Sequence, residues 1–430
     1  MRATYYPCLA RRRDYKNYFR SMFNSASRIA MFDSARASPF ANAIPLMRAL
    51  YGVSTPLILD PPSGPLRVNG QQIFSCTGGR QGCTWGAKNC SLALHPALLQ
   101  TSAYHPTSDI FGYIDDVTCH NATSAREAFD TNHDMQLYAE ELCLLQSDVT
   151  KGDFYCPDPT VDLSFLPPDM PGSPHHPAGR SNGLHIVGSF ISCDSQWAST
   201  ELRAHLSPKY RSLLDLHLLV DSPKNKAALA TQLGLLRNCA NGQPIYWLRN
   251  QRPSTTRLAA AQHDRLIEAS VYRLAKSLVS TSEDKTLALQ QAHLPVANMG
   301  GLDLRSSVAH AEAHYLSATA RALKSARTLV YPLADLSAAD PSSQPMVELA
   351  AALSTITALH TAVVDQYAIW DSNHIDHDTS GDKTYHFHPP LSTTAEAIPT
   401  LQDLDNSGSK LSCATRHFAA VVDNHAWIKF

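Results

Sequence analysis

Two adjacent aspartates, Asp115 and Asp116, stand between short apolar runs at residues 110–114 and 117–119. Aspartate suits turns and the flanking residues suit strands, so the pattern predicts a hairpin with both aspartates at its turn. Hard divalent ions prefer carboxylate oxygens, and a rigid hairpin would present such oxygens side by side. Two ions held in this way can activate an attacking hydroxyl and hold a phosphate leaving group, as in nucleotidyl transfer. Alone, the pair is a weak signal, because aspartates are common in solvated turns.

A glycine-rich segment lies upstream of the aspartate pair. Residues 75–83 read Ser-Cys-Thr-Gly-Gly-Arg-Gln-Gly-Cys, and they precede a stretch at 85–99 that we expect to form a helix ending near Pro96. Glycines in such a turn let the backbone approach a ligand closely. An ordinary loop before a helix is the alternative interpretation.

The two motifs, in this order, resemble those of reverse transcriptases from non-LTR retrotransposons. The glycine, two-residue spacer and Gln-Gly of that family match residues 78–82, and its aromatic-x-Asp-Asp hairpin matches residues 113–116. The resemblance implies an RNA-directed DNA polymerase, a nucleotidyltransferase that uses Mg²⁺ or Mn²⁺, an RNA template, a DNA primer and deoxynucleoside triphosphates. It implies that Asp115 and Asp116 bind metal and catalyse. It also implies substrate contacts from Gly79, Gln81, Gly82 and Tyr113.

Other segments agree with this resemblance. Lys151 matches a catalytic lysine near the nucleotide phosphates, where it would neutralise or protonate the leaving pyrophosphate. A surface lysine is the alternative. Residues 183–188 resemble a hydrophobic hairpin beside the primer. The region that follows the palm in these enzymes is matched by Asp264, Leu294-Pro295, residues 300–304 and an alanine-rich stretch at 309–322. The resemblance covers residues 17–330.

One metal ligand of the family does not match. Its first block places an aspartate shortly before a segment that here is residues 22–28, and counting back from that segment gives Tyr18. Asp14 lies four residues too early, and Asp33 lies too late. A tyrosine does not bridge two Mg²⁺ ions, and we expect the fingers region to be largely missing. We therefore expect an impaired polymerase; the alternative is an inactive relic that at most binds nucleic acid.

The net charge of −2 hides an uneven distribution. Residues 101–170 contain thirteen acids and two bases, whereas residues 201–257 contain nine bases and three acids. This predicts a metal-rich centre beside a track for a polyanion, although two solvated faces of opposite sign would give the same counts. The sequence shows no apolar run of membrane-spanning length and no signal-peptide core. We expect an intracellular chain, in the cytoplasm or nucleus, with no membrane partner.

The order of the elements predicts an α+β chain, with strands and helices first and helices later. The resemblance specifies it as an incomplete polymerase palm, a β-sheet with packed helices, followed by a mainly helical thumb-like domain. We expect the partial palm over residues 1–157 and a linker or loop over 158–182. The end of the palm and the helical region would cover 183–330, and a helical segment with a polar, His-rich tail would cover 331–430.

Residue types predict several local elements of the first half. Asn69-Gly70 predicts a hairpin, because this dipeptide suits the tightest hairpin turns. Residues 125–145 are expected to form a helix and residues 183–191 a strand. The ten cysteines contain no CxxC pair, which indicates buried free thiols rather than a zinc site.

Two long helices are expected in the second half. Ser254 or Thr255 is a candidate cap for a helix that carries Ile267 and Val271 on one face. Pro345 is a candidate start for the other. Its apolar face would consist of Met346, Leu349, Leu353, Ile356 and Val363.

Overall fold

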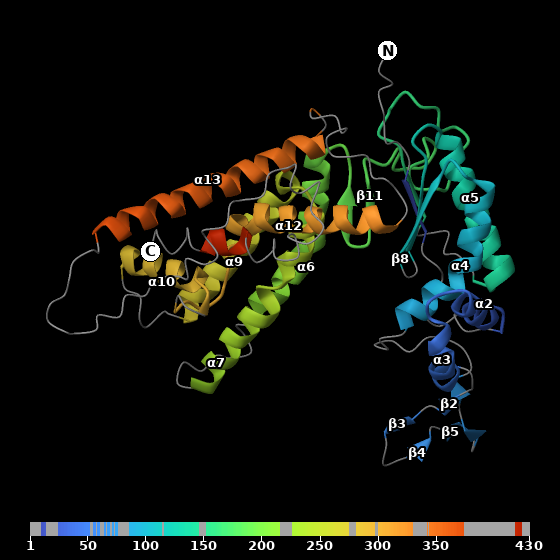
Figure 1. Cartoon of the computed structure of the whole chain (residues 1–430), viewed down its shortest axis with the longest axis horizontal. Helices are drawn as coiled ribbons and strands as arrows, with labels where there is room; N and C mark the ends of the chain where they lie inside the picture. Colours follow the sequence, from blue (N-terminus) through green and yellow to red (C-terminus); the bar gives the residue numbers. More distant parts are fainter. Residues whose placement is uncertain are drawn as a thin grey trace. The chain divides into compact units, whose positions relative to one another are not determined.

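The structure is a computed structural model of the chain (Figure 1). It describes residues 10–13 and 25–51, the short strands between residues 55 and 75, residue 342, and residues 86–113, 116–145, 152–215, 226–274, 281–296, 300–329, 344–373 and 418–423. The chain divides into two compact units, Met1–Trp197 and Ala198–Phe430. Each unit has its own hydrophobic core.

A four-stranded antiparallel sheet forms the centre of the first unit. Its strands are β1 (Ala10–Arg13), β8 (Asp109–Tyr113), β9 (Asp116–His120) and β10 (Asp153–Tyr155), in the order β10-β1-β9-β8. In the chain, α2 (Ser25–Arg36) and α4 (Gly86–Tyr104) lie between β1 and β8, and α5 (Ala125–Cys143) lies between β9 and β10. This order is the split βαβ arrangement. The predicted mixture of helix and sheet is confirmed.

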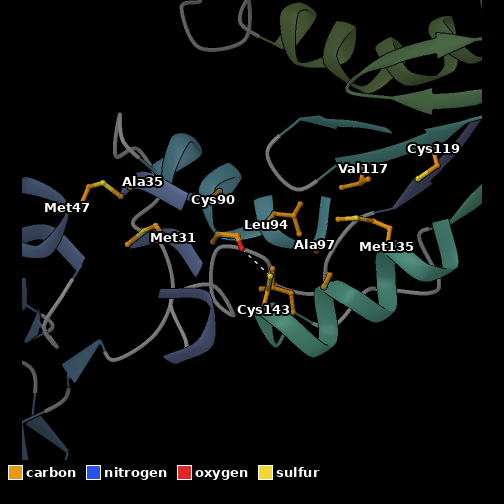
Figure 2. Packing of buried hydrophobic residues seen from close by; sticks show 13 residues of the cluster. Met31, Ala35, Met47, Cys90, Leu94, Ala97, Val117, Cys119, Met135 and Cys143 are labelled. Carbon is orange, nitrogen blue, oxygen red and sulfur yellow. Dashed lines mark hydrogen bonds between the residues drawn. The ribbon is translucent and has the colours of Figure 1, made fainter. Parts of the chain in front are cut away.

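The helices pack on one face of this sheet (Figure 2). Apolar residues of α2, α4 and α5 meet Val117 and Cys119 of β9 in one core. Its fully buried helical residues include Met31, Ala35, Ala93, Leu94, Ala97, Met135, Ala139 and Cys143. The Sγ of Cys143 donates to the carbonyl of Ala93 at 3.1 Å, the dashed line in Figure 2. Burial raises the pKa of Cys143 to about 11, so this thiol is neutral and structural.

Helix α4 does not end near Pro96 as expected, because it continues through this proline to Tyr104. A proline inside a helix removes one hydrogen bond and costs about 3 kcal/mol or more. Ala93, Leu94 and Ala97 on either side of Pro96 are fully buried. Burying such side chains contributes roughly 1.5–3 kcal/mol for each large one, which offsets the lost hydrogen bond.

Short paired strands follow α3 (Ile44–Tyr51) and the turn of helix at Ala41–Ala43. They are β2 (Thr55–Pro56) with β7 (Phe74–Ser75), β3 (Ile58–Asp60) with β4 (Gly64–Pro65), and β5 (Arg67–Val68) with β6 (Gln71–Gln72). Val68 pairs with Gln71, which confirms the hairpin predicted there. The Asn69-Gly70 dipeptide itself lies outside the described residues.

The segment expected as a linker or loop, residues 158–182, is a packed loop of the first unit. Leu163 and Leu166 are buried against Phe154 of β10 and against Ala125 and Ala128 of α5. Phe154 N donates to the carbonyl of Pro171 at 3.0 Å. Gly172 has φ +93, and a Cβ there would lie 1.9 Å from the carbonyl oxygen of Phe154. Only glycine fits this approach.

Residues 183–191 form a hairpin rather than one strand. Its strands are β11 (Leu184–Ile186) and β12 (Ser189–Ile191), and Ile186 pairs with Ser189. The two residues between them, Val187 and Gly188, have φ values of 48 and 77. Positive φ at both positions is the geometry of the tight turns that suit the twist of a hairpin.

The second unit is helical throughout its described residues. Its helices are α6 (Ser195–Asp215, whose first turn lies in the first unit), α7 (Lys226–Leu235), a π-helical turn (Leu236–Ala240), α8 (Gln243–Asn250), α9 (Pro253–Leu274), α10 (Ser282–His293), α12 (Ser307–Leu329) and α13 (Gln344–Asn373). A short helix at 418–423 follows. The core joins α12, α13 and this last helix through residues such as Leu316, Ile356 and Phe418. The predicted helical region is confirmed.

Helix α9 begins one residue earlier than its expected caps. Pro253 is its first residue, a position that proline favours because the missing N–H has no helical partner there. Ser254 does not cap the helix: its backbone N donates to the Glu348 carboxylate at 3.1 Å, and its hydroxyl donates to the same group. Ile267 and Val271 are buried on one face, as predicted.

Helix α13 contains a segment, Met346–Asp365, that is long and apolar enough to cross a membrane by length and composition. Its inner face, with Leu349, Ile356 and Val363, is buried as predicted. Only 28% of the most apolar window is buried, and the segment also carries Glu348, which bonds to Ser254 of α9. Helix α13 also contacts α9 and α12.

Candidate functional site

The predicted hairpin around the aspartate pair is present. Strands β8 and β9 are antiparallel, and Tyr113 pairs with Asp116, so a two-residue link joins them. These two residues, Ile114 and Asp115, lie outside the described residues. Asp116 is the first residue of β9 and is half-buried.

The two faces of this hairpin differ. On β8, Ile110 packs against the core and Gly112 meets Leu98 of α4 at ordinary contact distance. Side chains alternate along a strand, so Phe111 and Tyr113 point to the face away from the helices. They are 59% and 60% exposed. Because directly paired residues share a face, Asp116 lies on the same side as Tyr113. Two exposed aromatic rings therefore stand next to a carboxylate on an open sheet face.

The far end of the hairpin is held by polar contacts. His120 Nδ1 and Asp109 Oδ2 are 3.3 Å apart across the two strands. Asn121, which follows β9, bonds through its amide nitrogen to Ser108 Oγ at 3.1 Å and through Oδ1 to two backbone N–H groups ahead of α5. Ser124 then caps α5 by accepting from the backbone N of Glu127. The hairpin and the start of α5 are thus fixed as one piece.

Sequence reasoning missed a partly buried ionic cluster beside the hairpin and α5. His105, just after α4, contacts Glu127 through Nδ1 at 2.8 Å and Asp134 through Nε2 at 2.9 Å, and both carboxylates belong to α5. Burial lowers the pKa of His105, but the two hydrogen bonds and charges outweigh it, and the pKa is raised overall. Both ring nitrogens are occupied, so the cluster joins α4 to α5. A lone histidine before Pro106 gave no signal for this contact.

The β11–β12 hairpin lies beside β1 and β10 of the sheet. Tyr155 of β10 is buried, and its hydroxyl accepts from the backbone N of Cys193 at 2.9 Å. Burial raises the pKa of Tyr155 to about 12. His185 stacks on Phe190 at 4.6 Å between ring centroids. Tyr155 therefore ties the residue that follows the hairpin to β10, and the His185–Phe190 stack joins the two strands of the hairpin itself.

Most of the predicted site residues fall outside the described part of the chain. They are Gly79, Gln81, Gly82, Asp115, Lys151 and also Tyr18. Tyr113 and Asp116 are described and lie together. Asp33 is bound to Arg36 at 2.6 Å on the surface of α2. Within the described residues no group of three or more His, Cys, Asp or Glu side chains is arranged to hold a metal ion.

Four segments singled out in the second half of the sequence meet in one place. Gly301 lies so close to the end of α10 that a Cβ would be 2.0 Å from the carbonyl oxygen of Leu294. Asp303 N donates to that same carbonyl at 2.8 Å. Asp264 of α9 then accepts at the start of α12, from Ser306 Oγ at 2.6 Å, Ser307 N at 2.7 Å and Val308 N at 3.1 Å.

No protein-family profile matches this chain. No curated protein has a significantly similar sequence.

Proposed function

We propose that this chain derives from an RNA-directed DNA polymerase and holds a nucleic-acid strand on the open half of its sheet. The observation that carries the proposal is the pairing of Tyr113 with Asp116 on an exposed face of a split βαβ sheet. An aromatic ring accepts a base or sugar by stacking, with about 1–3 kcal/mol for each stacked base. Phe111, two residues away on the same strand, extends this platform.

Adjacent carboxylates at the β8–β9 link suit a divalent ion. Strand β9 starts at Asp116, and Asp115 directly precedes it in the sequence. Acidic oxygen ligands are those that Mg²⁺ and Mn²⁺ prefer. A bound ion would neutralise phosphate charge beside the strand end. The chain itself would supply the carboxylates and the stacking surface. We expect one ion at most to bind, and weakly, because the family's first aspartate is matched by Tyr18.

The register of β1 offers a second candidate for that missing carboxylate. Arg13, the last residue of β1, pairs with Val117, the neighbour of Asp116. The next residue in the sequence is Asp14, which like Tyr18 lies outside the described residues. Asp14 is therefore the carboxylate that directly follows, in the sequence, the residue paired with the neighbour of Asp116. Asp14→Asn and Tyr18→Asp therefore test which position belongs to the metal site. Weaker Mn²⁺ binding by Asp14→Asn would assign it to Asp14, and tighter binding by Tyr18→Asp would assign it to Tyr18.

Binding of a labelled primer–template tests the proposed surface. The double variant F111A/Y113A should bind at least about tenfold more weakly, since two stacking contacts are lost. The matched control is Tyr104→Ala, an equally exposed tyrosine (65%) on α4, behind the sheet. Equal loss in both variants, or no loss in F111A/Y113A, would contradict the proposal.

Primer extension with Mg²⁺ or Mn²⁺ distinguishes an active polymerase from a protein that only binds nucleic acid. We expect little or no synthesis, because we infer that the full set of metal ligands is not present. Template-dependent extension that disappears in D115N/D116N would establish a working polymerase. Binding without extension would leave a protein that only holds nucleic acid.

A further inference from the structure

The second unit contains a groove between α8 and α12, two helices that pack against each other. Its volume is about 500 Å³. The residues that line it include Gly242, Tyr246, Arg249 and Asn250 from the α8 side and Ala318 and Arg321 from α12.

The sequence of α8 explains why one of its faces is left open. Tyr246, Arg249 and Asn250 follow Gly242 at spacings of four, three and one, which puts all of them on one side of the helix. The opposite side buries Pro244, Trp247 and Leu248. On α12 the small side chain of Ala318 leaves room between the two helices. Figure 1 shows α12 running through the centre of this unit.

The groove carries positive charge without a balancing acid. No carboxylate lines it, and within the described part of the chain neither Arg249 nor Arg321 forms an ion pair. Other arginines of this unit are paired: Arg257 with Glu312 at 3.5 Å and Arg305 with Asp423 at 3.3 Å. The guanidinium of an arginine without an acidic partner can donate two parallel hydrogen bonds to the oxygens of a phosphate or a carboxylate.

The histidine next to the groove does not share this charge at neutral pH. His314 lies one turn before Ala318 on α12. Burial, together with the nearby His310, Arg249 and Arg305, lowers its pKa to about 3. The charge of the groove therefore comes from the two arginines and persists over the whole physiological pH range.

We propose that this groove binds the phosphodiester backbone of a single-stranded nucleic acid. Arg249 and Arg321 would each bind a phosphate, and the ring of Tyr246, which is 47% exposed, would support a base. An acidic peptide would also suit two arginines, but it gives the aromatic ring no flat partner. The groove belongs to the second unit, and binding there does not depend on whether the sheet of the first unit binds nucleic acid.

The test uses the full chain and a short fluorescent oligothymidylate, with affinity followed by anisotropy at several salt concentrations. Each measurement is made in the wild-type chain and in the F111A/Y113A background, which removes the proposed platform on the sheet. R249Q/R321Q should bind at least about tenfold more weakly in both. Its salt slope should fall by about 1.4, since each lost phosphate contact on a single strand removes about 0.7.

The charge-matched control is R265Q/R273Q, which removes two exposed arginines of α9 outside the groove. It should keep the wild-type affinity and slope. Arg321 is exposed, so Arg321→Gln alone still tests the groove if the double variant folds poorly. Tyr246→Phe should keep the affinity, and Tyr246→Ala should lose roughly tenfold.

Two results would overturn the proposal. One is the same affinity and slope for R249Q/R321Q and R265Q/R273Q. The other is complete displacement of the oligonucleotide by an equal charge concentration of polyglutamate, combined with an unchanged affinity in Tyr246→Ala. Either result would assign the groove to no ligand or to an acidic peptide. A failure here leaves the sheet proposal untouched, because the Phe111 and Tyr113 variants measure that surface separately.

Discussion

Removing the carboxylate of Asp264 should destabilise the second unit strongly. Asp264 is buried and accepts three hydrogen bonds at the start of α12, two of them from backbone N–H groups. A hydrogen bond to a charged group contributes about 1.5–3 kcal/mol, and its loss leaves a buried donor without a partner. The three bonds act together, so Asp264→Ala should cost about 3–5 kcal/mol rather than the full sum.

Urea unfolding followed by circular dichroism measures this cost, since the second unit is helical. For a slope of about 3 kcal/mol per molar, the midpoint of its transition should fall by about 1 M or more. Asp264→Asn keeps the shape but loses the charge, and it should fall between the wild type and Asp264→Ala. The control is Asp284→Ala, which removes an exposed capping box on α10 and should cost only about 0.5–1 kcal/mol.

The pH dependence gives a second readout of the same residue. Burial raises the pKa of Asp264, but hydrogen bonds from His263, Ser306 and the α12 backbone outweigh it, and the pKa is lowered overall. A lowered pKa means that the stabilisation is present above the ordinary aspartate pKa and is lost as pH falls through the folded value. The difference between wild type and Asp264→Asn should therefore shrink in acid. Equal midpoints for Asp264→Ala and Asp284→Ala would refute this reasoning.

Three further changes test the packing around the two proposed sites. His105→Ala should lower the stability of the fold most below about pH 6.5, because the pKa of His105 is raised in the folded state. The stabilisation by the protonated ring is present in that range and is lost as pH rises through the folded pKa. Thermal unfolding at several pH values measures this loss, and a loss that does not depend on pH would contradict it. Gly301→Ala should lower the unfolding temperature, because the Cβ of the new alanine would meet the carbonyl of Leu294. Gly234→Ala is the control: no atom lies near the Cβ position there, so the unfolding temperature should stay the same or rise. Met135→Ala should cost about 2–5 kcal/mol in urea unfolding, since the side chain is fully buried, and a loss below about 1 kcal/mol would mean that the core closes over the cavity.

The hairpins show how far sequence patterns predict this fold. Asn69-Gly70 and the aspartate pair both combine turn residues with flanks that suit strands, and the paired strands stand where these patterns put them. Residue types alone predicted one strand over residues 183–191 and not the turn at Val187-Gly188, because a valine with positive φ gives no signal in the sequence. At Pro96 the sequence predicted the end of a helix that in fact continues. The burial of the neighbouring residues is a tertiary effect, and it overrides the local tendency of proline to end a helix.

The candidate site at Tyr113 and Asp116 could be predicted only in part from the sequence. Local patterns identify Asp116 and Tyr113, but not their separation from the helix-covered face, which depends on the alternation of β8 against α4. The exposure of Phe111 followed from that same alternation. The contacts of His105 and Asp264 join helices far apart in the chain, 29 residues to Asp134 and 44 residues to Val308. No periodicity encodes such pairs.

Calorimetric titration of Mn²⁺ into the full chain and into D115N/D116N tests whether the carboxylates at the β8–β9 link bind a divalent ion beside the exposed aromatic face. We expect one weak site in the wild-type chain and no measurable site in D115N/D116N. We also expect tighter binding of a primer–template when Mn²⁺ is present. Equal Mn²⁺ binding by the two proteins, or no binding by either, would contradict it.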